Sequence, residues 1–320
     1  MAWVGWLLLA GAAGLLVAGA ELFVENAAGA ARRLGVTVIA IGILLAGAEP
    51  EELLTAVIAA LQDRPGLAAG DAVGANVTML TACLGLAALV RPLQLGHRVR
   101  QYALLSAVAG VLAVLALLSG TVGRVEGALL VTGYVSLVGL VWWREKEPPT
   151  IGELAEIAEH ADDEHAGDDD DRSGSRSPAR SLVLVVVGIA LMVVGGDLAV
   201  RGAVRVVESL GRTDSAIGLT LLALATTAEL FALVLTAARH AVPEIAVAGV
   251  VGSAAYNATA TLGAAALARP LVVEGVLAAS VLAAVLPLAV LALAPRGRLG
   301  RPAGAALCTA YVVYVVVVLA

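Results

Sequence analysis

Three carboxylates stand close together inside an apolar stretch of this sequence. The segment GAEPEEL, residues 47–53, carries Glu49, Glu51 and Glu52 around Pro50. Proline removes a backbone hydrogen-bond donor and can break a helix, which frees backbone carbonyl groups to coordinate a cation. Carboxylate and carbonyl oxygens are ligands for hard cations such as calcium and sodium. The segment therefore predicts a cation-binding break in a helix.

A later apolar segment, residues 225–229 with the sequence ATTAE, carries one matching acid, Glu229. It contains no proline or glycine, so a break there must come from its threonine side chains or from bound ions. On a continuous helix Glu49 and Glu52 share a face, whereas Glu51 points about 100° away from Glu52. Ionisable groups within a membrane are costly and usually functional. We therefore place Glu52 and Glu229 at the centre of the site, with Glu49 beside them.

Glycines and small polar residues follow each acidic segment. GDAVGANVTMLT occupies residues 70–81, and GVVGSAAYNATAT occupies residues 249–261. Glycines allow helices to approach closely, and Ser, Thr and Asn side chains either hold helices together or offer neutral oxygen ligands. We select Thr226, Ser253 and Asn257 as ligands. Zinc and copper are disfavoured because these segments contain no His or Cys.

Four other acidic residues are not assigned as ligands. Glu51 and Asp71 are both compatible with a place near a water-filled mouth, so we leave them outside the ligand set. Glu21 and Asp197 lie early in long apolar segments, where they either guide ions or form caps and pairs. The sequence favours neither of these two roles.

The composition is that of a membrane protein. Hydrophobic residues make up 60% of the 320 residues and charged residues 14%, which is too little charge to cover a soluble surface. Strict alternation of apolar and polar residues is absent, so the spans are expected to be helices rather than barrel strands. The only two cysteines in the sequence, Cys83 and Cys308, lie in apolar runs and are expected to act as small hydrophobic residues. The first apolar run has no basic residue before it, and we interpret it as a span.

Ten apolar segments are long enough to cross a bilayer as helices. Their predicted ranges are residues 3–30, 35–61, 66–90, 99–120, 125–143, 181–209, 214–238, 243–267, 271–294 and 303–319. Lys and Arg collect in cytoplasmic loops of membrane proteins, and 14 of the 20 such residues here fall on one set of alternate loops. This bias predicts a multi-pass plasma-membrane protein with both termini outside and the central loop in the cytoplasm.

The central segment, residues 145–180, differs from its surroundings because it holds 12 acidic and four basic residues. Such a composition predicts a disordered, solvated cytoplasmic linker. Loose calcium sensing stays open as a second role, although the segment lacks the spaced ligands and glycine of a dedicated calcium loop. We therefore divide the chain into a first repeat at 1–144, this acidic linker, and a second repeat at 181–320.

The two halves repeat each other in sequence. Gly19 pairs with Gly195, and Pro65 pairs with Pro243 at nearly the same offset along the chain. Small slips between long collinear matches indicate duplication followed by drift. Each unit has five predicted helices, an odd number, so the second unit enters the membrane from the opposite side. The predicted fold is an all-α integral membrane protein with ten transmembrane helices in two inverted five-helix repeats.

At these residues the chain resembles the sodium/calcium exchanger superfamily of cation antiporters, and the resemblance covers nearly everything outside the central loop. That family has the motifs GxxxxVIGxT…GTSxPE and GNxxGSNxxN in each half. They are represented here by Ile41-Gly42, Gly47, Glu52, Gly74 and Asn76, and by Ile217–Thr220, Glu229, Gly252-Ser253 and Asn257. The resemblance implies that Glu52 and Glu229 are the central glutamates and that Ser253 and Asn257 are ligands.

The sequence also departs from the family motifs. Thr-Ser before the first glutamate is replaced by Ala48-Glu49, and in the second repeat Ala225-Thr226 stands at that place. The first-half serine and last asparagine of the motif are Ala75 and Met79 here. An added carboxylate at Glu49 with fewer neutral oxygens favours proton coupling or an altered stoichiometry.

Together these features predict a secondary-active antiporter that exchanges Ca²⁺ for Na⁺ or H⁺ by alternating access, with the first and sixth helices sliding across the core. A passive cation pathway and a non-transporting sensor or scaffold acting through the acidic loop are the alternatives.

An enzyme is disfavoured because no nucleophile–base pair or histidine cluster is found. We expect no cofactor beyond the transported ions, and membrane lipid and inorganic cations as partners, with no nucleic acid. The coupling ion and the oligomeric state are left open.

Overall fold

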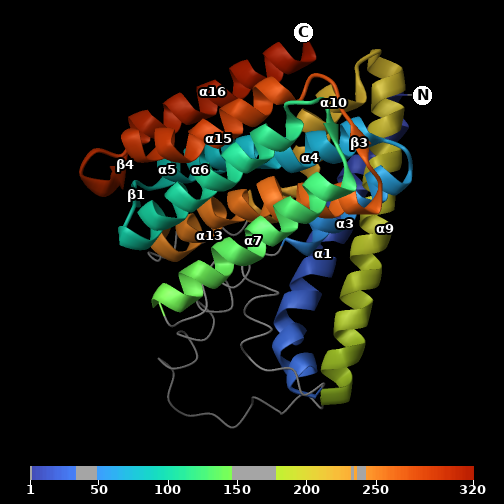
Figure 1. The fold of residues 1–320 in the computed structure, drawn as a ribbon, viewed down its shortest axis with the longest axis horizontal. Helices are drawn as coiled ribbons and strands as arrows, with labels where there is room; N and C mark the ends of the chain where they lie inside the picture. Colours follow the sequence, from blue (N-terminus) through green and yellow to red (C-terminus); the bar gives the residue numbers. More distant parts are fainter. Residues whose placement is uncertain (1, 34–48, 146–177, 232–233, 236–242) are drawn as a thin grey trace.

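The computed structural model describes residues 2–33, 49–145, 178–231, 234–235 and 243–320, and it is almost wholly helical there (Figure 1). The first half contains α1 (Ala2–Arg33), α3 (Pro50–Leu61), α4 (Pro65–Thr78), the π-helical turn η1 (Met79–Cys83), α5 (Leu84–Val90), α6 (His97–Leu117) and α7 (Arg124–Glu145). The second half contains α9 (Pro178–Leu210), α10 (Asp214–Ile217), η2 (Gly218–Leu222), α11 (Ala223–Thr226), α13 (Pro243–Tyr256), η3 (Asn257–Thr261), α14 (Leu262–Ala268), α15 (Leu277–Ala292), a short 3₁₀ turn η4 (Pro295–Gly297) and α16 (Arg301–Leu319).

This architecture confirms the predicted all-α class. Six of the described helical stretches are long and apolar enough to cross a bilayer: Trp3–Phe23, Pro65–Val90, Val99–Leu117, Arg124–Val141, Arg180–Leu210 and Arg301–Leu319. Two shorter apolar stretches, Asp214–Thr226 and Leu277–Ala292, lie among them. The motif residues Ile41, Gly42 and Gly47, and most of the predicted linker at 145–180, lie outside the described residues.

One predicted helix range begins in a short apolar strand, and another runs a few residues past the end of its helix, within the margin expected for predicted boundaries. The predicted range 271–294 begins with strand β3 (Leu271–Val272), and α15 starts only at Leu277. The predicted range 99–120 likewise extends past the end of α6 at Leu117, toward strand β2 (Thr121–Val122). Gly120 and Gly275 both have positive φ, so the chain turns at these glycines, and apolar content alone does not separate a strand from a helix.

Over one long stretch, the helices and strands of the two halves begin and end at equivalent residues. The succession α4–η1–α5–β1, with β1 at Leu93–Gln94, reappears at one constant offset in the second half as α13–η3–α14–β3. The strand pairs also correspond between the halves. Strand β1 pairs with β4 (Arg298–Leu299), and β3, the second-half equivalent of β1, pairs with β2. Each pair therefore joins one half of the chain to the other.

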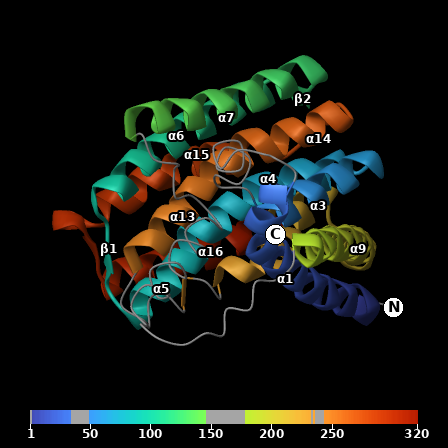
Figure 2. The ribbon, with the colours of Figure 1, turned by 90° about the horizontal axis from the view of Figure 1, so that it is seen from below.

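The long helices α1 and α9 pack side by side at one end of the bundle, across the direction of most other helices (Figures 1 and 2). They are antiparallel, because Gly5 contacts Gly202 while Gly19 contacts Gly188. A Cβ atom at Gly202 would lie 3.0 Å from the carbonyl oxygen of Gly5, and one at Gly188 would lie 2.7 Å from that of Gly19. Small residues thus bring the two backbones into direct contact.

A second kind of glycine contact occurs twice, each time between a helix of the first half and a helix of the second. A Cβ atom at Gly263 on α14 would lie 2.8 Å from the carbonyl oxygen of Gly127 on α7. The counterpart joins α5 to α16, where a Cβ at Gly304 would lie 2.7 Å from the carbonyl oxygen of Gly85. These crossings hold the peripheral helices against the central ones.

We predict that Gly263→Val destabilises the fold, because its side chain has no room beside Gly127. Overpacking of this kind costs about 1–3 kcal/mol, so the melting temperature of the purified protein should fall by several degrees. Gly139→Val on α7 is the matched control, because a Cβ there meets nothing within 4 Å. Equal melting temperatures for the two variants would contradict this packing.

Candidate cation-binding site

The first acidic segment contains the start of helix α3, and the residues before Glu49 on the other side of the predicted break lie outside the described part of the chain. Helix α3 begins at Pro50, and Glu49 before it has non-helical dihedral angles of φ −107° and ψ 83°. The backbone N–H groups of Glu52 and Leu53 both donate to the Glu49 carbonyl oxygen at 3.1 Å. Glu49 therefore lies outside the helix, and the continuous helix on which we compared these glutamates does not exist. The turn nevertheless keeps Glu49 next to Glu52.

The second break lies at two threonines whose hydroxyl groups contact the backbone, which favours threonine side chains among the two causes that the sequence left open. Helix α11 ends at Thr226, and Thr227 has a ψ of 5°, outside the helical range. Hydroxyl oxygen Oγ1 of Thr226 lies 3.1 Å from the Ala223 carbonyl oxygen, and that of Thr227 donates to the same carbonyl at 2.7 Å. Such back-bonding competes with the helical hydrogen bonds and bends or ends a helix.

The structure brings four of the six predicted ligands together around Glu49. Amide Nδ2 of Asn257, at the start of η3, donates to Glu49 Oε2 at 3.0 Å. The Asn257 oxygen Oδ1 in turn accepts from the Thr261 hydroxyl at 3.0 Å. The side chains of Glu52 and Ser253 also lie beside the Glu49 carboxyl group. A carboxylate pair from the first half thus meets a hydroxyl and an amide from the second.

The fifth predicted ligand, Thr226, contacts a residue that we had left outside the ligand set. Its hydroxyl donates to Asp71 Oδ1 at 3.0 Å. Asp71 is fully buried on α4, and Glu51 is buried as well, so the expectation of a water-filled mouth is wrong for both. Gly70 and Gly74 flank Asp71 and allow close packing of α4 on η2, since a Cβ at Gly70 would lie 2.9 Å from the Leu219 nitrogen.

One sequence signal identifies Asp71 in retrospect. It stands between small residues in the GDAVG segment, where a helix can pack closely on every side. All residues from Gly66 to Thr78 are buried, so α4 lies in the middle of the bundle rather than at its edge.

The other acidic residues that the sequence singled out are Glu229, Asp197 and Glu21. Glu229, the sixth predicted ligand, is buried on the helical turn that follows Thr227. Asp197 forms an ion pair with Arg201 at 2.8 Å and accepts from Gln62 at 2.8 Å, which favours the pairing role. Glu21 is exposed, and its role stays a prediction.

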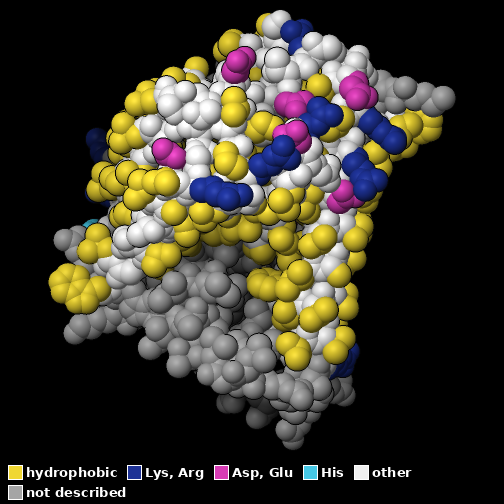
Figure 3. Space-filling view, turned by 45° about the vertical axis from the view of Figure 1, so that its right-hand side comes forward, with side chains coloured by type: hydrophobic (Ala, Val, Ile, Leu, Met, Phe, Trp, Pro, Cys, Tyr) yellow, Lys and Arg dark blue, Asp and Glu magenta, His cyan; other side chains and the backbone are white. Residues whose placement is uncertain are grey.

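The ion pairs between oppositely charged side chains in the described residues lie at the surface. Among the described residues the ion pairs are Arg64–Asp214, Arg201–Asp197 and Arg269–Asp63, and all three involve accessible side chains. Figure 3 shows basic and acidic side chains side by side on one area of the surface, next to broad hydrophobic areas. None of these pairs involves the buried carboxyl groups.

Four buried carboxyl groups, those of Glu49, Glu51, Glu52 and Asp71, have no ion-pair partner in the described part of the chain. The same residues also provide oxygens without a hydrogen-bond partner there: Glu49 Oε1, Glu51 Oε2, both Glu52 oxygens and Asp71 Oδ2. An uncompensated buried charge costs several kcal/mol, so these groups need bound cations or protons.

The acidic groups do not form one preassembled metal cage. Within the described residues, no three His, Cys, Asp or Glu side chains are arranged to hold one metal ion. Neutral oxygens are needed to complete a coordination sphere, and two of them, Ser253 Oγ and Asn76 Oδ1, are buried without a hydrogen-bond partner in that part of the chain. Hard cations accept such mixed oxygen sets.

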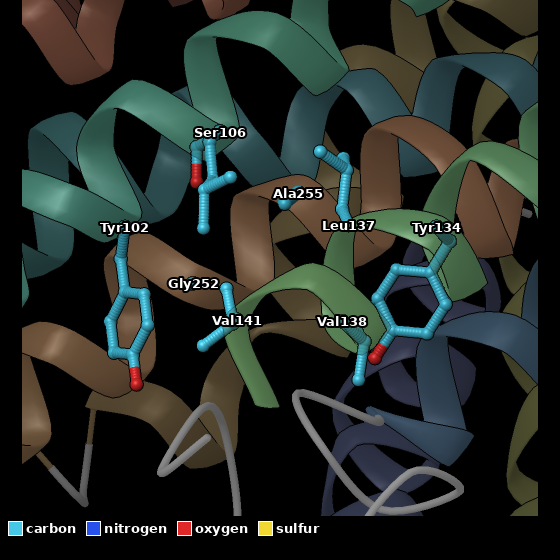
Figure 4. A pocket seen from close by; sticks show the side chains of 9 residues that line it. Tyr102, Ser106, Tyr134, Leu137, Val138, Val141, Gly252 and Ala255 are labelled. Atoms are coloured by element: carbon cyan, nitrogen blue, oxygen red, sulfur yellow. The ribbon is translucent and has the colours of Figure 1, made fainter. Parts of the chain in front are cut away.

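A small cavity lies between α6, α7 and α13 (Figure 4). Tyr102, Ser106, Tyr134 and Val141 line it together with Gly252, the neighbour of Ser253. Its volume of about 20 Å³ is room for about one water molecule. A cavity of about 640 Å³ lies between α10, α15 and α16, and Val77 and Thr81 of the first half also line it.

The sequence model of the family described as "Sodium/calcium exchanger protein" matches residues 4–143 and 180–320 of the chain. This chain belongs to the sodium/calcium exchanger family. It is accordingly a multi-pass membrane protein of a calcium and cation antiporter family, and it is not an enzyme. The predicted family, transport class and membrane location are thereby confirmed.

Relatives within the exchanger family match along most of their length. The protein CaxA of Alkalimonas amylolytica, which carries the name of an antiporter, is 29% identical over 270 residues, 82% of this chain and 81% of its own. The inner membrane protein YrbG of Escherichia coli is 26% identical over 270 residues, 83% of this chain and 78% of its own. The solved structure of the sodium-calcium exchanger NCX_Mj has a TM-score of 0.62 at 22% identity and covers 99% of both chains, which establishes a shared fold.

We predict that Ca²⁺ raises the melting temperature of the purified protein, because a cation relieves repulsion among the buried carboxylates. At about 100 times its Kd a ligand stabilises by about 2.7 kcal/mol, which corresponds to a rise of several degrees. Glu52→Gln should lose most of this rise, whereas Glu274→Gln, at an exposed position, should keep it. A full rise in Glu52→Gln would contradict the site.

Proposed function

We propose that this exchanger-family protein transports Ca²⁺ in exchange for Na⁺ or H⁺ by alternating access. The observation that carries the proposal is the Glu49–Asn257 hydrogen bond, which joins a buried carboxylate of one half to a side-chain amide of the other, with no basic ion-pair partner for that carboxylate in the described residues. Glu52 and Glu229 bind the ions at the centre, and Glu49, Thr226, Ser253 and Asn257 complete the coordination.

The charge of the site couples the two ion fluxes. Empty, ionised carboxylates in a low-dielectric interior are strongly unfavourable, so the site changes sides only when cations or protons occupy it. Calcium moving one way therefore requires a counter-ion on the return. Inorganic cations and membrane lipid are then the partners of this chain, and the transported ions are its only small ligands.

The proposed architecture has ten transmembrane helices in two inverted five-helix repeats, residues 1–144 and 181–320, joined by the acidic linker 145–180. The shared bounds of α4–β1 and α13–β3 support the repeat, and the antiparallel contact of α1 with α9 supports its inversion. Related halves of opposite orientation can exchange conformations, which exposes one central site to each side in turn.

The moving elements in this proposal are α1 and α9. Glycine-rich contacts make them one unit, and they cross the other helices at one end of the bundle (Figure 2). One polar contact, from Gln62 on the α3–α4 turn to Asp197 on α9, ties this unit to the core at 2.8 Å. Sliding of the pair past α3 would open the site to alternate faces.

Transport should depend on both central glutamates. In proteoliposomes loaded with Na⁺ or given a proton gradient, the wild type should take up ⁴⁵Ca²⁺, and uptake should stop when the gradient collapses. Glu52→Gln and Glu229→Gln should each lower the initial rate by at least about tenfold, a loss of about 1.4 kcal/mol in transition-state stabilisation. Glu274→Gln is the control and should transport normally.

Wild-type exchange in both glutamine variants would contradict these roles. Calcium flux that continues without any counter-ion gradient would show a passive pathway instead of an exchanger.

Orientation is tested by cysteine accessibility in cells. The distribution of Lys and Arg supports a plasma-membrane protein with both termini outside and residues 145–180 in the cytoplasm. With Cys83 and Cys308 replaced by serine, a membrane-impermeant maleimide should label Ala320→Cys on intact cells and Ser175→Cys only after permeabilisation. The reverse labelling pattern would contradict the proposed topology.

A further inference from the structure

The cavity of about 640 Å³ between α10, α15 and α16 contains none of the residues selected as ion ligands (Figure 1). Cavities that hold a small molecule have volumes of about 300–1,000 Å³, so this one is large enough for a guest. Thr213 and Ser215 line it at the start of α10, and side chains of α15 and α16 form two of its walls. We call it the α15–α16 groove.

The wall of the groove offers little to a polar guest. The Tyr314 hydroxyl donates to the Leu219 carbonyl oxygen at 3.0 Å, and the Thr81 hydroxyl donates to the Val77 carbonyl oxygen, so both groups are already hydrogen-bonded within the protein. Most of the other lining side chains are apolar, among them Leu282, Leu286, Val313, Val317 and Val318. A hydrocarbon fits such a wall, whereas a polar solute would give up its hydrogen bonds to water.

The groove is open toward the bilayer. Leu282 on α15 and Val313 and Val317 on α16 line it, yet their side chains are 39%, 55% and 69% exposed. Helix α16 is apolar and long enough to cross the membrane, so exposed apolar side chains along it lie against lipid chains. The surroundings that can fill the groove are therefore lipid hydrocarbon.

A basic side chain lies at one end of the groove. Arg212 directly precedes Thr213, and its Nη1 donates to the Ala320 carbonyl oxygen at 2.6 Å, just beyond Val317 and Val318. It thus joins the α10 wall to the α16 wall at this end. Arg212 is exposed, and no acidic side chain pairs with it in the part of the chain that the structure describes. A guanidinium has five N–H donors, so several stay available for a phosphate group.

One residue of the groove wall also contacts the helix that carries Asp71. Leu219 belongs to η2, and a Cβ atom at Gly70 on α4 would lie 2.9 Å from its backbone nitrogen. Its carbonyl oxygen accepts from Tyr314 of α16. The π-helical turn η2 is therefore held between α4 and α16, and a chain in the groove would add apolar contacts beside it.

We propose that the α15–α16 groove binds one acyl chain of a phospholipid whose phosphate group contacts Arg212. The apolar walls, the opening toward the bilayer and the positive charge at one end together match an apolar chain with an anionic head. In the orientation proposed above, Arg212 and Ala320 lie on the outer side, so the lipid belongs to the outer leaflet. This lipid is bound at a defined place, unlike the lipid that surrounds the rest of the protein.

The test titrates the purified, delipidated full chain in detergent with dioleoylphosphatidylglycerol and follows the melting temperature. The wild type should rise by several degrees at saturation, and native mass spectrometry should show one retained lipid per chain. Ala310→Phe on α16 fills the groove from one wall and Ala278→Phe on α15 from the other, and each should raise the lipid Kd at least about tenfold. Ala306→Phe, exposed on α16 but outside the groove lining, is the matched control and should bind normally.

The phosphate contact is tested with dioleoylglycerol, which has the same two chains and no phosphate. Arg212→Gln should raise the Kd of the phospholipid about tenfold and leave that of dioleoylglycerol unchanged, because only the phospholipid loses a charged hydrogen bond. Arg124→Gln, at another exposed arginine, is the control and should leave both constants unchanged.

Wild-type phospholipid affinity in both phenylalanine variants would mean that only surrounding lipid binds, which overturns the site. Equal effects of Arg212→Gln on the two lipids would overturn the phosphate contact. Because lipid binding is measured without transport, either result leaves the proposed antiport intact. A wild type that binds the lipid but moves no calcium would contradict the proposed function alone.

Discussion

Uncompensated negative charge in an apolar interior is the constraint on which the rest of this structure depends. Glu49, Glu51, Glu52 and Asp71 are buried, and no basic side chain pairs with them in the described residues. The basic residues that do form ion pairs there hold accessible acids at the surface. A protein keeps such an arrangement in a membrane only if something positively charged visits it.

The helix breaks and glycine contacts follow from this constraint. A carboxylate or hydroxyl at a break can turn toward the opposite half, as Glu49 does toward Asn257 and Thr226 toward Asp71. Glycines at Gly70 and Gly74 remove the side chains that would hold α4 away from η2. Both halves thus contribute to each contact, so a movement of one half relative to the other changes the ligands of an ion.

Sequence analysis recovered the class of fold, and it selected acids that the structure buries, for clear physical reasons. Apolar length predicts helices, proline at residue 50 predicts a break, and acids within apolar runs indicate function. It misjudged Asp71, because burial of one residue depends on what packs around α4 and not on local pattern. It also extended α15 back through β3, since the apolar residues of this short strand have the same hydropathy as a helix end.

The most direct test of the central claim is to locate the cation. Crystals of the protein soaked in Sr²⁺, a calcium surrogate, can be measured at a wavelength where strontium scatters anomalously. The account predicts an anomalous peak at coordination distance from the carboxylates of Glu49 and Glu52, with Asn257 beside it. No peak there at saturating Sr²⁺, or one bound only outside the buried carboxylates, would contradict it.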